Sequence, residues 1–239
     1  MRRALDLGVR RRVSTESGFP AYPSGSGDTF PWGAFVSICS GPAVPSDVAA
    51  TCGVDGILSV MLSGVLIRPA RPVDVPGIIT LFTAVAAERD SIGTEPGFDV
   101  AQRQSNILKS IEEATSCVLV AAVEDLVVGN LGIYAQHRQS VGSLGMMVAR
   151  QHRGQGIGGR LLDDSLHWAR ESGLHKVDLG VWPHNTAAIA LYRFRGFTIE
   201  GRLRRHYRRA NGELWDVVTM GLVLDTHSPG SSHPDADNL

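Results

Sequence analysis

The sequence has almost no excess charge of either sign. Its 23 lysines and arginines nearly balance 24 aspartates and glutamates, which leaves a net charge of −1. This balance gives no general electrostatic argument for binding nucleic acid or a membrane surface. Any apolar run long enough to span a bilayer is also missing. A chain of 239 residues with 43% hydrophobic residues suits one globular domain with tails, and we expect neither a membrane nor a nucleic acid partner.

Cysteine is scarce as well. Cys39, Cys52 and Cys117 show neither the spacing of metal ligands nor a disulfide framework. Cys117 opens an apolar run, which predicts a buried thiol in the core. This usage fits a reducing compartment, so we expect a cytoplasmic protein without a metal site.

Residues 1–60 lack a sustained hydrophobic period of either kind and are rich in Gly, Pro and Ser. The only candidate for the apolar part of a secretory signal, Trp32 to Cys39, is short and lies far from the start. A transit peptide stays an alternative, although the helical amphipathicity is poor. We predict a disordered extension. Met61, directly before the first clear strand, is a candidate for the native start.

Residues 61–224 are predicted to form the folded domain, and the polar residues 225–239 a disordered tail. Periodicity and turn signals predict elements in the order β-α-α-β-β-β-α-β-α-β-β. The fold class is therefore α/β (α+β), with a mixed, mostly antiparallel sheet of about seven strands flanked by four helices. Strands are expected near 65–68, 117–123, 126–134, 141–148, 176–181, 197–208 and 214–224. Helices are expected near 72–89, 99–114 and 185–195, with a further helix that contains Leu161, Leu162 and Leu166 and ends near Glu171.

The domain is organised around residues 141–170. An apolar strand leads into a polar turn with four glycines, and an amphipathic helix follows. A helix start has unpaired N–H groups and a partial positive charge, and glycines let the backbone close around an anion. The segment therefore predicts an anion-binding turn. Its glycines are Gly154, Gly156, Gly158 and Gly159.

The segment from Gly154 to Gly159 also fits the dinucleotide fingerprint G-x-G-x-x-G, with Asp178 about 20 residues further on. In a dinucleotide-binding fold, however, this motif opens the first βαβ unit, whereas here it follows a meander late in the domain. Four polar residues separate the strand from the first glycine, and Asp178 falls inside a predicted strand. We therefore reject dinucleotide binding, and the absence of Gly-Lys-Ser/Thr excludes a P-loop.

Two motifs together resemble the GNAT family of N-acetyltransferases. The stretch Gln151-His152-Arg153-Gly154-Gln155-Gly156 resembles the family's Q/R-x-x-G-x-G/A signature. The segment 177–197, with Asn185, Ala188, Leu191-Tyr192 and Gly196-Phe197, is similar to its L-x-V…N…A…LY…GF segment. The resemblance extends over residues 65–224 and includes the order of elements. The end of the domain, 199–216, resembles the branch that acts on amino acids and other small amines.

The resemblance implies acetyl-CoA as co-substrate. Backbone N–H groups from Arg153 to Gly158 would bind its pyrophosphate, and the Arg153 side chain would add charge. The end of the strand 141–148 would separate from the strand 176–181, and the pantetheine arm would pair with its backbone. The implied cofactor-binding residues are Met146, Met147, Val148, Gln151, Arg153, Gly154, Gln155, Gly156, Ile157, Gly158 and Asn185.

The resemblance also implies direct attack of a neutral amine on the thioester carbonyl. A backbone N–H near Val148 would stabilise the oxyanion. Tyr192, seven residues after Asn185 and so on the same helix face, matches the family's general acid, although a tyrosine buried in the core is the alternative.

The family's usual base, a glutamate on the strand before the glycine turn, is missing here. Glu95 in the loop 91–97 is our first substitute, and a solvated loop carboxylate is an equal alternative. His184, His137 and Asp216 are weaker candidates, and a water chain without a dedicated base is also open.

The predicted C-terminal hairpin carries a cluster of arginines around Tyr207. A solvated hairpin is one interpretation, and attraction of an acidic acceptor or RNA is the other. The cluster consists of Arg202, Arg204, Arg205, Arg208 and Arg209.

We predict an acetyl-CoA-dependent N-acetyltransferase that acts on the primary amine of a small molecule, an amino acid or an analogue. One alternative is an acetyltransferase of protein N-termini or ribosomal proteins. The other is a catalytically idle acyl-CoA-binding module, which the missing glutamate keeps open. A homodimer formed through the C-terminal hairpin also stays open.

Overall fold

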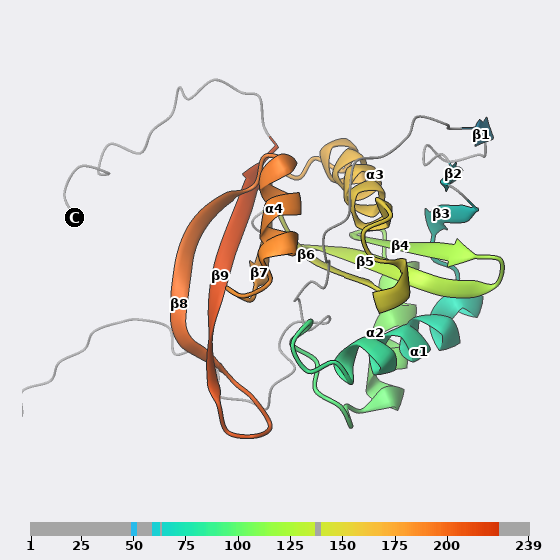
Figure 1. The fold of residues 1–239 in the computed structure, drawn as a ribbon. Helices are drawn as coiled ribbons and strands as arrows, with labels where there is room; N and C mark the ends of the chain where they lie inside the picture. The colour runs from blue at the N-terminus through green and yellow to red at the C-terminus, as the bar shows by residue number, and fades with distance from the viewer. Residues whose placement is uncertain (1–48, 52–58, 63, 137–139, 225–239) are drawn as a thin grey trace, which may run out of the picture.

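Strand pairing in the computed structural model builds one sheet of nine strands in the order β1-β2-β3-β4-β5-β6-β7-β9-β8 (Figure 1). The structure describes residues 49–51, 59–62, 64–136 and 140–224. The strands are β1 (Ala49–Thr51), β2 (Ser59–Leu62), β3 (Val65–Pro69), β4 (Ser116–Val123), β5 (Leu126–Gln136), β6 (Val141–Val148), β7 (Lys176–Val181), β8 (Thr198–Arg208) and β9 (Leu214–Val223). The helices are α1 (Val75–Ala86), α2 (Val100–Glu112), α3 (Ile157–Glu171) and α4 (Thr186–Phe194), with 3-10 turns η1 (Pro72–Asp74) and η2 (Arg150–His152).

The predicted fold class and order of elements are confirmed from β3 to β9. Two short strands, β1 and β2, extend the sheet beyond β3 by antiparallel pairing. β1 falls within the segment 1–60, for which we predicted disorder. The division into extension, domain and tail stays a prediction, because residues 1–48 and 225–239 lie outside the described residues.

The helices form layers on both faces of the central strands. Figure 1 shows α3 on one side of β4 and β5 and the pair α1 and α2 on the other. α3 contributes Leu161 and Leu162 to the core, both fully buried. Cys117 lies in the same core, as predicted, and burial raises the pKa of its thiol to about 12. In the described ranges, no helix has both the length and the apolar composition needed to cross a bilayer.

The first predicted helix, 72–89, is shorter in the structure. Its start is the 3-10 turn η1, where the buried Asp74 accepts hydrogen bonds from Arg68 at 2.6 Å and from the Arg71 N–H at 2.7 Å. These bonds, the one from Arg68 above all, hold the pKa of Asp74 below its ordinary value. The helix ends at Ala86 and not at Arg89, since Arg89 adopts a φ of 64° that no α-helix contains.

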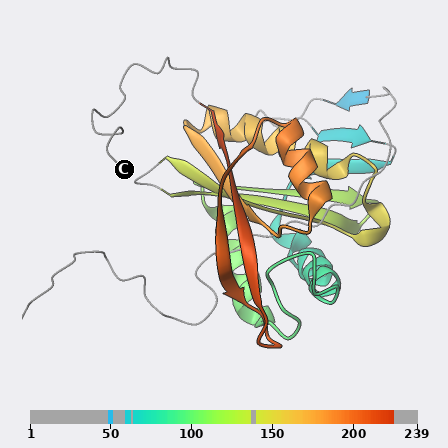
Figure 2. The same cartoon turned by 60° about the vertical axis from the view of Figure 1, so that its left-hand side comes forward.

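The sheet opens between β6 and β7. These two strands pair in parallel over three residues only, from Val141 opposite Lys176 to Ser143 opposite Asp178. Beyond that point β7 pairs only with β9. Figure 2 shows the β8–β9 hairpin running at a steep angle to β4 and β5. The carboxyl ends of β6 and β7 therefore diverge, as the resemblance implied.

Candidate active site

Along β6, every second residue directs its backbone N–H and carbonyl groups toward this opening. Ala149 donates its N–H to the Val128 carbonyl of β5 at 2.8 Å. Because neighbouring residues of a strand direct their N–H groups to opposite sides, Val148 and Met146 direct theirs away from β5. By the same alternation the backbone of Met147 is turned toward β5. Of the three predicted strand residues, two therefore present backbone groups to the opening and Met147 does not.

The turn that follows β6 contains two glycines in the left-handed region. Gly154 has a φ of 73° and Gly156 a φ of 81°, which a side chain would strain. Gly156 is the N-cap of α3, and no side chain caps that helix. The first N–H groups of α3, from Ile157 and Gly158, therefore have no acceptor within the helix and lie at its positive end. This arrangement fits the predicted pyrophosphate site.

Other side chains hold the turn in shape. The Gln155 amide donates to the Gln151 carbonyl at 3.1 Å, which closes the turn on itself. A Cβ at Gly159 would lie 2.7 Å from an amino group of Arg195, so the end of that side chain would have to move. Arg195 forms a two-bond ion pair with Asp163, both bonds at 3.0 Å, and so ties α4 to α3.

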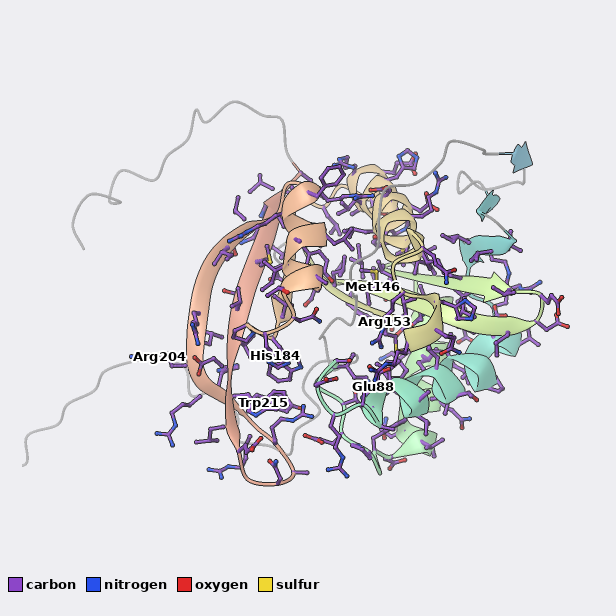
Figure 3. The ribbon with its side chains drawn as sticks, in the orientation of Figure 1. Glu88, Met146, Arg153, His184, Arg204 and Trp215 are labelled. Carbon is purple, nitrogen blue, oxygen red and sulfur yellow. The ribbon has the colours of Figure 1, made fainter. Side chains whose placement is uncertain are left out.

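Arg153 does not present the free charge that we predicted for the pyrophosphate (Figure 3). Its Nη2 donates to Glu88 Oε1 at 2.8 Å, and its Nε donates to the Val148 carbonyl at 2.9 Å. Its backbone N–H donates to the Arg150 carbonyl at 3.3 Å. The side chain is only 6% exposed. Arg153 therefore braces the turn against β6 and the end of α1, and contact with a pyrophosphate would have to compete with these bonds.

Tyr192 lies on the buried face of α4 with none of its surface exposed. Its ring packs 5.4 Å from that of Phe197, yet its hydroxyl has no hydrogen-bond partner in the described part of the chain. Burial raises the pKa of Tyr192 well above its ordinary value, so the hydroxyl keeps its proton. An unpaired buried hydroxyl costs roughly 1–3 kcal/mol, which points to a ligand atom as its partner.

Asn185 is the N-cap of α4, as predicted. Its Oδ1 accepts the Ala188 N–H at 3.2 Å. The predicted contact with the pantetheine arm stays a prediction, and it is compatible with the cap because the residue stands where β7 ends and α4 begins.

Glu95, our first candidate for the base, is held in an ion pair. Its Oε1 lies 2.7 Å from Nε of Arg209 and also accepts the Ala210 N–H at 3.3 Å. Arg209 is 3% exposed, also donates to the Ile92 carbonyl, and lies 4.5 Å from the centre of the Trp215 ring. The carboxylate of Glu95 therefore joins the loop to the β8–β9 hairpin, and this geometry gives no support to a role as base.

The loop 89–97 reaches both sides of the opening. On the β6 side, the Ser91 hydroxyl donates to Glu88 at 2.6 Å, and Glu88 in turn binds Arg153. On the β7 side, His184 Nε2 lies 3.0 Å from the Asp90 carbonyl. In Figure 3 the labelled Glu88 and Arg153 lie on one side of the site, and His184 lies on the other.

The arginine cluster of the hairpin is divided among different environments. Arg209 is buried, whereas Arg202 forms an exposed ion pair with Asp216 at 2.8 Å. Arg205 donates its backbone N–H to the same Asp216 at 2.7 Å, and these two contacts, the backbone one first, hold the pKa of Asp216 below its ordinary value. Figure 3 shows Arg204 on the outer side of β8. The cluster therefore does not form one basic surface.

One further candidate for the base remains to be placed. His137 lies outside the described residues. For metals, no group of three or more His, Cys, Asp or Glu in the described ranges could hold an ion.

Comparison with known proteins decides the family. Residues 82–197 match the model of the Acetyltransferase (GNAT) family. An L-amino acid N-acetyltransferase of Escherichia coli is 31% identical over 112 residues, which are 44% of this chain and 67% of that protein. The chain belongs to the GNAT acetyltransferase family. It is therefore an acetyl-CoA-dependent acyltransferase, as predicted.

This acetyltransferase is similar to further relatives over most of its domain. An L-methionine sulfoximine/L-methionine sulfone acetyltransferase of Pseudomonas paraeruginosa is 28% identical over 164 residues, 66% of this chain and 94% of the relative. Among solved structures, a ribosomal-protein-alanine N-acetyltransferase from Brucella melitensis is 29% identical with a TM-score of 0.61, over 66% of this chain and 99% of that chain.

The family model covers only part of the site of this acetyltransferase. The matched residues 82–197 contain β6, the glycine turn and α4, but end directly before β8. The hairpin that holds Glu95 through Arg209 lies outside them. Sequence reasoning missed this contact and the Glu88–Arg153 pair. The arginine cluster around Tyr207 pointed to the contact between Glu95 and Arg209. The sequence pattern of a hairpin, however, does not distinguish a buried arginine from solvated ones.

Proposed function

We propose that this acetyltransferase transfers the acetyl group of acetyl-CoA to the primary amine of an amino acid or a close analogue. The E. coli and Pseudomonas relatives, which are named for L-amino acids and for methionine sulfoximine and sulfone, support this acceptor class. The observation that carries the catalytic role is the Tyr192 hydroxyl, which is fully buried and has no partner among the described residues.

The chain offers groups that fit the pyrophosphate and the pantetheine arm of acetyl-CoA. The uncapped start of α3 would receive the pyrophosphate through the N–H groups of Ile157 and Gly158. The backbone groups of Met146 would pair with the pantetheine arm in the opening, and Asn185 would bind the arm from the other side. Arg153 would act indirectly, by holding the turn and the Val148 carbonyl in place.

The reaction proposed is direct attack of the neutral amine on the thioester carbonyl. As the carbon–nitrogen bond forms, negative charge develops on the carbonyl oxygen, and the Val148 N–H would stabilise it. As the carbon–sulfur bond breaks, the thiolate would take the proton of the Tyr192 hydroxyl. Burial raises the pKa of that hydroxyl, so it is protonated before the reaction begins.

A protein acceptor is the second candidate, because the Brucella structure is named as a ribosomal-protein-alanine N-acetyltransferase. The third, an idle acyl-CoA-binding module, rests on the missing strand glutamate. A cytoplasmic location and a homodimer stay predictions.

Release of free thiol from acetyl-CoA, measured over a panel of L-amino acids, methionine analogues, polyamines and N-terminal peptides, tests the three candidates. We expect turnover with a free amino acid or analogue. Turnover with peptides alone would support the second candidate and contradict ours. Tight binding of acetyl-CoA without turnover on any acceptor would support the idle module.

A further inference from the structure

The proposed reaction needs a group that removes a proton from the acceptor ammonium, and the carboxylates around the opening are engaged elsewhere. Arg209 holds Glu95 at 2.7 Å. Glu88 receives Arg153 at one oxygen and Ser91 at the other. None of them is free to take up a proton without losing a bond that fixes the loop.

His184 differs from these carboxylates in position and in exposure. It stands in the connection between β7 and α4, directly before Asn185, and it is exposed to solvent. Its ring lies parallel to that of Trp182, with centres 6.4 Å apart at 12°, and meets the Trp215 ring edge-on at 5.2 Å. The two tryptophans and the contact with Asp90 fix the orientation of the imidazole. In Figure 3 it lies on the far side of the site from Met146 of β6.

The contact with Asp90 also decides which nitrogen carries the proton. His184 Nε2 lies 3.0 Å from the Asp90 backbone carbonyl, and a carbonyl can only accept. Nε2 must therefore be the donor. In the neutral imidazole this leaves Nδ1 as the acceptor, with its lone pair available.

We propose that His184 is the general base of this acetyltransferase, acting through Nδ1. The inference rests on the proposed function, since it supplies the proton acceptor for the amine. The substrate ammonium gives one proton to Nδ1, and the neutral amine attacks the thioester carbon. The nitrogen loses a second proton as the amide forms, and this proton replaces the one that Tyr192 gave to the thiolate. The proton on His184 leaves to solvent, so each turnover releases one proton.

The polar and charged groups around the imidazole come from the loop 89–97 and from the hairpin. From the loop 89–97, Asp90 presents its carbonyl, and Glu95 pairs with Arg209. From the hairpin, Arg209 lies over the same Trp182 and Trp215 rings. Glu213 accepts the Trp215 indole N–H at 3.0 Å. The guanidinium of Arg209, which lies over these two tryptophan rings, is thus paired with the carboxylate of Glu95.

The test compares His184→Gln with His184→Ala. The glutamine amide still donates to the Asp90 carbonyl but does not accept a proton near neutral pH, whereas alanine loses both functions. We expect His184→Gln to lower kcat/KM about 100- to 10,000-fold and to remove the acid limb of its pH profile. Added imidazole should restore part of the activity of His184→Ala. His167→Gln, an exposed histidine of α3 that pairs with Glu171, is the matched control and should leave activity unchanged.

Substrates with a weakly basic amine, already neutral at the assay pH, sharpen the test. They need no base, so His184→Gln should lose little activity with them. If His184→Gln turns over ordinary amines like the wild type, His184 only tethers the loop and the inference is wrong. If the wild type itself turns over no amine, the proposed function fails, and that result is seen before any variant is made.

Discussion

The glycine turn of residues 149–156 and the loop of residues 89–97 flank the same opening, but different interactions hold them in place. The turn is shaped by its own backbone, with Gly154 and Gly156 at positive φ and the uncapped start of α3 behind them. The loop is shaped by side chains from distant elements. Arg209 and Tyr207 of the hairpin bind its carbonyl groups, the latter donating to Gly93 at 2.7 Å.

The difference matches the two substrates that the segments would bind. A pyrophosphate is the same in every acetyl-CoA, so a backbone turn suffices to bind it. An acceptor amine differs between enzymes, and its loop is fastened by a hairpin that lies outside the family match. The comparison therefore predicts that changes in the turn affect acetyl-CoA first, whereas changes at the loop affect the acceptor first.

The largest effect is expected from Gly156→Asp. The substitution forces a side chain into a φ of 81° and places a carboxylate at the anion-binding helix start. Binding of CoA should be abolished. At a CoA concentration 100 times its Kd, the wild type should gain about 2.7 kcal/mol of stability, and the variant none.

Gly173→Asp is the matched control for this change. Gly173 also has a positive φ, 73°, and nothing lies within 4 Å of the position of its Cβ, but it ends α3 and is far from the turn in sequence. It should lose stability from backbone strain and keep its CoA-induced thermal shift. A Gly156→Asp protein that is still stabilised by CoA would remove the turn from the cofactor site.

Tyr192→Phe should have the next largest effect. Loss of the acid should lower kcat about 100- to 10,000-fold while the Kd of acetyl-CoA stays unchanged. Because the hydroxyl is buried without a partner among the described residues, its removal should leave the free energy of unfolding equal or slightly higher. Denaturant unfolding and single-turnover kinetics measure the two quantities. Equal kcat would make Tyr192 a core tyrosine only.

Arg209→Met tests whether the loop 89–97 affects binding of the acceptor amine. It leaves Glu95 without its buried partner, so we expect a loss of about 3–5 kcal/mol in unfolding free energy. The KM of the acceptor should rise while the KM of acetyl-CoA stays close to that of the wild type. Adding Glu95→Gln to the variant should recover part of the stability.

Arg68→Met is the control for the loss of a buried ion pair. Arg68 pairs with the buried Asp74 at 2.6 Å, at the start of α1 and away from the loop. Its loss should cost stability without a selective change in the acceptor KM. If both variants raise the two KM values equally, the hairpin contributes nothing specific to the acceptor site.

The same contrast explains how much the sequence could predict. The strand 141–148 and the end of the following helix at Glu171 follow from local periodicity and were predicted. The start of that helix was not, because it begins at Ile157 and includes Gly158 and Gly159, which we had placed in the turn. The contacts of the loop join residues far apart in the chain. Tyr207 and Gly93 are 114 positions apart, and Arg153 and Glu88 are 65 apart. No local pattern encodes such pairs, which is why Glu95 was expected to be a free carboxylate and Arg153 a free charge.

The smallest effect is expected at the pair of Glu88 and Arg153, which joins the glycine turn to the start of the loop 89–97. Glu88→Gln keeps the shape of the side chain but weakens the bond to Arg153, which also holds the Val148 carbonyl. Because both side chains are largely buried, we expect a coupling energy of about 1–3 kcal/mol between Glu88→Gln and Arg153→Gln in a double-mutant cycle of kcat/KM. Each single variant should raise the KM of both substrates, since the pair touches the turn and the stem of the loop. A coupling near zero would mean that the glycine turn and the loop 89–97 are held in place independently of each other.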